Sequence, residues 1–215
     1  MFNPLKKLPF YRRYSTKSLS EGWRNRKLDW KQAYGSTWNH PHRQLIVWML
    51  KTIPFQSLWE VGVGAGANLV AILKEMKGVQ LGGSDVNPDA IKACHETFGG
   101  GLFHVEQGDN LLMSDKSVDV VLSDMCLIYV GPLKIKDYLR EFKRVARTAV
   151  VLVEFHSPSF WDRLKVRLNG HHAHDYRKVL DELGYYDIMV QRIPSKFWPD
   201  AGTDTGLRHI ITAKT

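Results

Sequence analysis

Three glycines stand at alternate positions in the stretch SLWEVGVGAGANLVAIL, residues 57–73. Gly62, Gly64 and Gly66 separate two apolar runs, and a backbone without Cβ atoms can turn sharply there and bring its N–H groups against a ligand. A helix beginning near Ala67 would add unpaired N–H groups and a partial positive charge at the same place. The turn therefore predicts a binding site for an anionic or strongly polar group.

Glu60 narrows the choice of ligand for this turn. The pattern Gly62-x-Gly64-x-x-Ala67 formally matches a dinucleotide-binding motif, with Asp85 at about the expected spacing. Glu60 stands two residues before the first glycine and would repel a pyrophosphate, whereas its carboxylate suits a ligand with a cationic amino group. We therefore favour such a ligand over NAD, and disfavour an oxidoreductase.

Strands and helices alternate around this turn. Period-two and β-branched runs predict strands, while apolar spacing, helix caps and glycine stops predict helices. The alternation requires parallel strands with right-handed crossovers, and the last two strands, joined by a loop alone, must be antiparallel. We predict an α/β fold, a Rossmann-like doubly wound seven-stranded sheet, mostly parallel with an antiparallel last strand. The expected strands are 57–61, 79–86, 102–107, 117–124, 149–155, 185–193 and 206–214, and the helices 41–51, 67–76, 87–98, 132–147 and 174–183.

Charge divides the chain into two parts. Residues 1–31 carry nine Lys and Arg against two acids, a balance of +7, while the whole chain has a formal net charge of +8. We expect a basic, aromatic-rich arm or lid over residues 1–40 and one domain over residues 41–215. Such an arm can attract RNA, an anionic membrane surface or a phosphorylated substrate. A solvated terminus is the plainer alternative, and an organelle transit peptide is disfavoured by Pro4 and Pro9.

Composition argues against several other classes of protein. Apolar residues make up 44% of the chain and the mean hydropathy is mildly negative, as in globular proteins. No apolar run reaches the length of about 18 residues that spans a bilayer, and no secretory signal is evident. Cys94 and Cys126 lack disulfide or zinc spacing, so we expect reduced core residues and a cytoplasmic protein. His171, His172 and His174 lack partner ligands, and we predict no metal site.

Four motifs, taken in order, resemble one enzyme family. EVGVGAGAN (60–68) resembles the nucleotide-binding loop of class I S-adenosylmethionine-dependent methyltransferases, and GSDVNPDAI (83–91) resembles their second motif. QGDNLLMSDKSVDVVLSD (107–124) is similar to the next pair of motifs. A reversed closing strand is also typical of the family. The resemblance covers about residues 45–215 and extends to the methyltransferase-11 type.

The resemblance implies S-adenosylmethionine as cofactor. In the family, an acid at the end of the second strand holds the ribose hydroxyls, and one carboxylate can accept both hydrogen bonds. The next acidic motif would contact the adenine, and the residues after the fourth strand would border the methyl group. The implied cofactor contacts are Glu60, Gly62, Gly64, Gly66, Asn68, Asp85 with Val86 (ribose), Asp109 with Asn110 (adenine), and Ser123, Asp124 and Met125 (methyl group).

Candidates for the acceptor site lie above the strand ends or in the N-terminal cover. His156 directly follows the fifth strand and could serve as a general base, since an unperturbed His has a pKa near 6.5; Asp124 is the second catalytic candidate. Ordinary packing and loop capping are the alternatives for each residue. The remaining candidates are Tyr34, Trp38, His40 and His42 in the N-terminal cover, Tyr129 after the fourth strand, and Phe197 and Trp198 in the last loop.

The acceptor class is suggested by two stretches. SDMCLIYVGP stands where nucleic-acid amino-methyltransferases carry an (N/D/S)-P-P-(Y/F/W) tetrapeptide, which argues against methylation of base amino groups. YLREFKRVARTAVVLVEF resembles small-molecule methyltransferases, although ARTA replaces their usual K-P-G-G turn. We predict methyl transfer to an O or N atom of a small molecule. The alternatives are an RNA methyltransferase that uses the basic arm, and a cofactor-binding interaction module without turnover.

Overall fold

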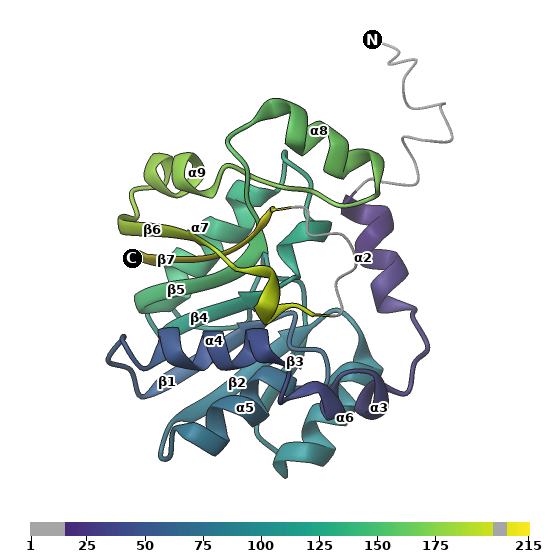
Figure 1. The fold of residues 1–215 in the computed structure, drawn as a ribbon. Coiled ribbons are helices and arrows are strands. Elements are labelled where there is room, and N and C mark those ends of the chain that lie inside the picture. The colour runs from purple at the N-terminus through teal and green to yellow at the C-terminus, as the bar shows by residue number, and fades with distance from the viewer. Residues whose placement is uncertain (1–15, 200–205) are drawn as a thin grey trace.

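A computed structural model of the chain describes residues 16–199 and 206–215, so the first part of the predicted arm lies outside the described residues. A seven-stranded sheet in the order β3-β2-β1-β4-β5-β7-β6 forms its centre (Figure 1). The strands are β1 (Ser57–Val61), β2 (Gln80–Asp85), β3 (Leu102–Val105), β4 (Val118–Asp124), β5 (Ala146–Phe155), β6 (Tyr186–Arg192) and β7 (Arg208–Lys214). β7 runs antiparallel to both neighbours and the other pairs are parallel, which confirms the predicted fold.

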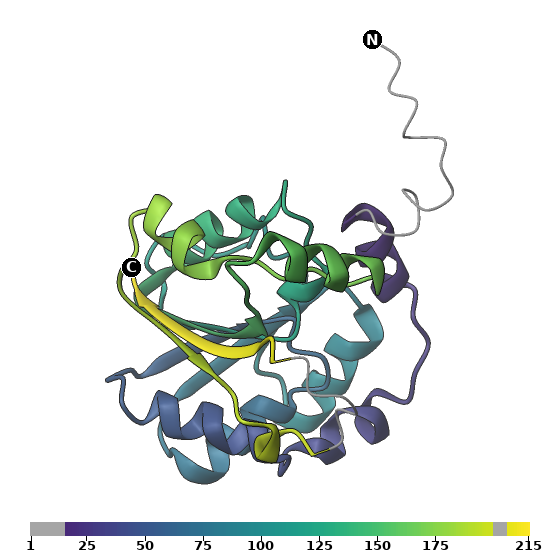
Figure 2. The same ribbon diagram turned by 45° about the horizontal axis from the view of Figure 1, so that its top comes forward.

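Helices cover both faces of the sheet (Figure 2). α4 (Pro41–Leu50), α5 (Ala67–Glu75) and α6 (Pro88–Phe98) lie on one face, and α7 (Ile135–Val145) and α9 (Tyr176–Glu182) on the other. Each face has its own apolar core, with Leu69 and Ile72 buried beneath α5 and Phe142 beneath α7. Full burial of one such side chain stabilises the fold by about 1.5–3 kcal/mol.

Local chemistry explains where the predicted helices begin and end. The Asn87 side chain accepts hydrogen bonds from the Asp89 and Ala90 N–H groups, and Gly99 ends α6 in the left-handed conformation. The helix predicted over 132–147 is shorter at both ends. It stops at Val145 because the next residue, Ala146, already pairs with β4 at Val118.

Three helices were absent from the sequence prediction. They are α2 (Thr16–Arg24), α3 (Trp30–Ala33) and α8 (Phe160–Leu168), and short 3-10 turns occur at η2 (Gly35–Thr37), η3 (Leu127–Tyr129) and η4 (Ser195–Phe197). α3 has four residues, and α2 and α8 have nine each, so the apolar period can be followed over too few residues to give a clear signal. None of the helices in the described ranges is long and apolar enough to cross a membrane.

Hydrogen bonds and ion pairs hold α2 and α3 over the carboxyl ends of the strands. The Asn87 side-chain amide donates to the backbone oxygens of Trp23 at 2.7 Å and Arg26 at 2.9 Å. Two ion pairs of 2.7 Å, Lys27–Asp89 and Lys31–Glu96, add exposed contacts with α6. The described part of the basic arm therefore packs on the domain as a cover.

Candidate active site

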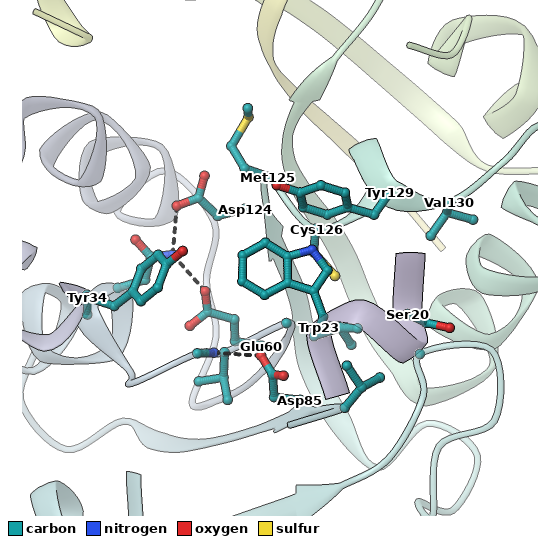
Figure 3. Close-up of a pocket in the computed structure, with 18 of the residues that line it drawn as sticks. Ser20, Trp23, Tyr34, Glu60, Asp85, Asp124, Met125, Cys126, Tyr129 and Val130 are labelled. Carbon is teal, nitrogen blue, oxygen red and sulfur yellow. Dashed lines mark hydrogen bonds between the residues drawn. The ribbon is translucent and has the colours of Figure 1, made fainter. Parts of the chain in front are cut away.

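A cavity of about 280 Å³ opens where the carboxyl ends of β1, β2 and β4 meet the cover formed by α2 and α3 (Figure 3). Parallel strands place ligand sites at this edge of an α/β sheet. Many residues singled out in the sequence come together here. Those that line the cavity are Tyr34, His42, Glu60, Gly62, Gly64, Asn68, Asp85, Val86, Asp124, Met125, Tyr129 and Trp198.

The glycine turn differs in one respect from the sequence prediction. Its N–H groups are already used within the protein: Gly62 donates to Ser84 O at 2.8 Å, and Gly64 donates to Asp85 Oδ2 at 3.0 Å. Gly62 has φ of 79°, and a Cβ there would lie 2.6 Å from the Cys126 side chain. The turn therefore shapes the cavity wall and brings the backbone close to it, and the polar groups for a ligand come from elsewhere.

Two buried carboxylates share one amide beside this turn. Asn68 Nδ2 donates to Glu60 Oε1 at 2.6 Å and to Asp124 Oδ2 at 3.0 Å. Asp124 Oδ2 also accepts from Arg43 Nη1 at 3.2 Å. Glu60 Oε2 and Asp124 Oδ1 are buried and have no hydrogen-bond partner among the described residues. An unpaired buried polar atom is costly, so these two oxygens mark a place for a donor or cation from a ligand.

The pKa values of the two acids are shifted in opposite directions. Burial raises the pKa of Glu60 to about 8, against the lowering effect of the Asn68 hydrogen bond, and the nearby Asp124 charge raises it further. Burial also raises the pKa of Asp124, but the charge and hydrogen bond of His42, together with Arg43, bring it down to about 2. Asp124 is therefore ionised at neutral pH, and without a bound cation Glu60 is mainly protonated.

A second polar group stands on the N-terminal side of the cavity. His42 Nε2 lies 2.9 Å from Asp124 Oδ2, and His42 Nδ1 lies 2.5 Å from His40 Nδ1. The Trp198 ring stacks on His42 with a centroid distance of 4.0 Å and an interplanar angle of 20°. The last loop thus reaches the site through Trp198.

Aromatic side chains from the cover close the cavity. Trp23 on α2 meets Tyr129 edge-on, with centroids 5.2 Å apart, and Figure 3 shows both rings over the cavity. Trp30 stacks with Tyr34 at 5.4 Å. A ligand in this cavity would therefore meet carboxylates on the sheet side and aromatic rings on the cover side.

Asp85 and Glu106 form the acidic wall toward β2 and β3. Asp85 accepts hydrogen bonds from the Gly64 and Asn87 N–H groups, and burial raises its pKa. Glu106 lines the cavity directly after β3, and its buried Oε1 lacks a partner among the described residues. Asp109, by contrast, lies 3.6 Å from Lys134 and is outside the lining, as is the exposed Asn110.

Several other predicted residues also lie outside the lining. Gly66 has φ of 78° and faces the Phe98 ring. Ser123 Oγ donates to the buried Glu154 carboxylate at 2.9 Å. His40 caps α4 and contacts His42, and the Trp38 ring lies 4.2 Å from Lys74 Nζ. Phe197 packs edge-on against Trp48.

His156 is also away from the cavity. Its Nδ1 accepts a hydrogen bond from the Tyr176 N–H at 3.2 Å, and burial together with the neighbouring His209 lowers the pKa of His156 to about 4. The predicted general base is thus part of the packing between β5 and α9. Across residues 16–199 and 206–215, no cluster of three or more His, Cys, Asp or Glu could hold a metal ion.

Sequence reasoning passed over several residues of the lining. Glu106 directly follows the third strand and was as visible as Asp85, but the family motif pointed to Asp109 instead. Cys126 and Arg43 are neighbours in sequence of the predicted Met125 and His42, whereas tertiary structure alone brings in Trp23, Trp30 and Tyr138.

Comparison with known proteins agrees with this geometry. Residues 59–149 match a family model described as a methyltransferase domain. No curated protein sequence matches the chain. Among solved structures, a SAM-dependent methyltransferase from Archaeoglobus fulgidus is 17% identical, with a TM-score of 0.59 over 80% of this chain and 94% of that one.

Two further structures have the same fold. Magnesium protoporphyrin IX methyltransferase from Synechocystis PCC 6803 with bound SAM has 14% identity and a TM-score of 0.64, covering 93% of this chain and 96% of that one. Phosphoethanolamine N-methyltransferase 2 from Haemonchus contortus has 14% identity and a TM-score of 0.61, covering 81% of this chain and 52% of that one. Residues 59–149 therefore match a methyltransferase domain, and the fold is that of solved S-adenosylmethionine-dependent methyltransferases.

The residues present fit this cofactor. Its amino-acid part carries an ammonium group, for which the unpartnered oxygens of Glu60 and Asp124 are suited. Its ribose carries two hydroxyls, and the Asp85 carboxylate keeps accepting capacity beyond the two N–H groups that it holds. At Gly62 and Gly64 the intervening wall consists of backbone atoms alone.

Proposed function

We propose that the protein transfers a methyl group from S-adenosylmethionine to an O or N atom of a small-molecule acceptor. The observation that carries this proposal is a cavity of about 280 Å³ that is lined by Trp23 and Tyr34 from the cover and by Tyr129 from η3. A small molecule fits under such a cover more readily than a folded polymer. The magnesium protoporphyrin IX and phosphoethanolamine methyltransferases with this fold are named for small acceptors.

Within this proposal, the sheet-side acids bind the cofactor. Glu60 and Asp124 would hold its ammonium group, and Asp85 its ribose hydroxyls. Glu106, directly after β3, is better placed than Asp109 to contact the adenine, because it lines the cavity with an unpartnered oxygen. Arg43 Nη1 lies 3.2 Å from Asp124 Oδ2 and would balance part of the negative charge of these acids.

The acceptor would lie between Met125 and Tyr129 on one side and the cover on the other. The sulfonium supplies an electrophilic methyl group, so the protein mainly has to align the acceptor atom at about 3–3.5 Å. Asp124, with a pKa of about 2, is a weak proton acceptor and suits cation binding better. His42 is the cavity-lining imidazole, and it could pass a proton only through its contacts with Asp124 and His40.

A labelled-methyl assay tests this function. The protein is incubated with methyl-labelled cofactor and fractions of a small-molecule extract, in parallel with total RNA, and label transfer is measured against a Glu60→Gln/Asp85→Ala double variant. Transfer to a small-molecule fraction by the wild type alone supports the proposal. Label on RNA that declines steeply with salt would favour the RNA methyltransferase. Cofactor binding with no transfer to any fraction would favour the interaction module.

We further propose that residues 1–40 act as a lid on a domain formed by residues 41–215, in a cytoplasmic protein. The lid is supported by the cavity-lining Trp23, Trp30 and Tyr34. The cytoplasmic location is supported by the free thiols of Cys94 and Cys126, which are typical of reducing compartments.

A further inference from the structure

Helix α8 has its apolar side facing outward. Phe160, Trp161, Leu164 and Leu168 are 61%, 68%, 37% and 56% exposed, whereas Val166 is the buried member of the helix. A helix on the surface of a globular protein normally turns its apolar face to the core. Clustered exposed apolar side chains of this kind indicate an interaction surface.

The spacing of these side chains gives one continuous face. At about 100° per residue, the four apolar residues of α8 fall within an arc of about 100°. Arg167 borders one edge of this arc and Lys165 the other, and both are exposed. The acid of the helix, Asp162, is turned to the protein, where Ser157 Oγ donates to it at 3.1 Å. The face is therefore an apolar stripe between cations.

We infer that α8 docks on the surface of an anionic lipid bilayer. Aromatic and Leu side chains beside Lys and Arg are the composition of helices that lie in a membrane interface, with the apolar face in the acyl boundary and the cations at the headgroups. Trp is the residue most suited to that boundary.

The surrounding charge favours the same occupant. Figures 1 and 2 both show α8 on the same side of the molecule as α2, the first described helix of the basic arm. Within residues 16–31, the described part of that arm, five cations stand against two acids. A second copy of the chain would bring like charges together at Lys165 and Arg167. RNA would neutralise the cations but leave the apolar stripe in water.

The docking face is connected to the active site. His171 follows α8, and its ring lies 5.4 Å from the Tyr129 ring that lines the cavity. His172 N donates to Ile128 O at 2.7 Å in η3. A bilayer against α8 would therefore lie beside the cover of the cavity. The docking itself does not depend on the identity of the acceptor.

Vesicle flotation tests the inference with the full chain. We expect it to bind vesicles of phosphatidylcholine with phosphatidylglycerol, to bind pure phosphatidylcholine at least about tenfold more weakly, and to lose binding as salt rises. Trp161→Asp should reduce binding at least about tenfold, and Lys165→Glu/Arg167→Glu should remove the preference for anionic lipid. Trp48→Asp is the matched control, because Trp48 is 55% exposed on α4, away from α8, and its substitution should leave binding unchanged.

A spectroscopic readout separates insertion from loose attraction. Lipids brominated in the upper acyl chain should quench tryptophan fluorescence in the wild type, and Trp161→Phe should bind equally well but lose most of that quenching. Equal binding by wild type and Trp161→Asp would overturn the inference. Two other results would also overturn it. One is a wild-type protein that binds no vesicles but forms a dimer, which Trp161→Asp converts to a monomer; the other is a wild-type protein that binds RNA and no vesicles. Unchanged melting temperature with S-adenosylhomocysteine in each variant would show that the cofactor site is intact.

Discussion

The side-chain amide of Asn68 donates a 2.6 Å hydrogen bond to Glu60 Oε1 and thereby fixes an acid that burial keeps mainly protonated. The same amide reaches Asp124, so one neutral group holds two carboxylates close together. A bound ammonium group would stabilise both in their ionised form. Cofactor binding should therefore be coupled to the loss of a proton from Glu60.

The affinity for S-adenosylhomocysteine is expected to rise with pH between about 6 and 7.5. The pKa of Glu60 in the free protein is about 8, so each unit of pH in this range increases the ionised fraction by up to about tenfold. Calorimetry in buffers of different ionisation enthalpy should show proton release. Glu60→Gln should bind more weakly and without this pH dependence; a steep pH dependence in that variant would exclude Glu60 as the group.

The free energy of unfolding of the ligand-free protein should fall between pH 7 and 8. Burial raises the pKa of both Glu60 and Glu154 from 4.5 to about 8, so in this window the folded state binds more protons than the unfolded state. Buried histidines such as His156, whose pKa is lowered, are neutral in the folded state and mainly neutral in the unfolded state here. The melting temperature should drop by about 2–4 °C per kcal/mol lost. In Glu60→Gln the melting temperature should fall less between pH 7 and 8 than in the wild type. An equal fall in both proteins would contradict the raised pKa of Glu60.

Gly62→Ala should destabilise the protein more than Gly78→Ala. The two glycines have nearly the same φ, 79° and 80°, so the backbone penalty of about 1–2 kcal/mol is shared. A Cβ at Gly62 would also lie 2.6 Å from the Cys126 side chain, whereas a Cβ at Gly78 would meet no other residue's atoms within 4 Å. Denaturant unfolding and S-adenosylhomocysteine titration should show extra instability and weakened binding only for Gly62→Ala. Equal stability and equal binding in the two variants would contradict a steric clash between a Cβ at residue 62 and Cys126.

Trp23→Ala should weaken S-adenosylhomocysteine binding by about tenfold, mainly through faster dissociation. Trp23 covers the cavity through its contact with Tyr129 and takes no part in the sheet. Stopped-flow displacement measures the dissociation rate directly. Trp48→Ala serves as control, since Trp48 lies on α4 outside the lining and should leave the rate unchanged. An unaltered rate in Trp23→Ala would mean that α2 is not a lid.

The sequence by itself determined the sheet, the reversed last strand and the acidic glycine turn. These depend on local patterns: Asn87 and Pro88 begin α6 by capping, and apolar β-branched runs such as residues 149–153 favour buried strands. The order of acids along the chain was enough to indicate the cofactor. It was not enough to choose between Glu106 and Asp109, which are three residues apart in one loop. The path of that loop decides which of the two side chains faces the cavity.

Tertiary structure alone decided which side chains meet. Asp124 is joined to His42 and Arg43, about 80 residues away along the chain, and this contact sets its low pKa. His156 was a candidate general base because it directly follows the fifth strand, yet its Nδ1 accepts a hydrogen bond from the N–H of Tyr176, the first residue of α9. The outward face of α8 could be recognised only once burial was known, because an amphipathic pattern gives the period of a helix but not the direction in which its apolar side points.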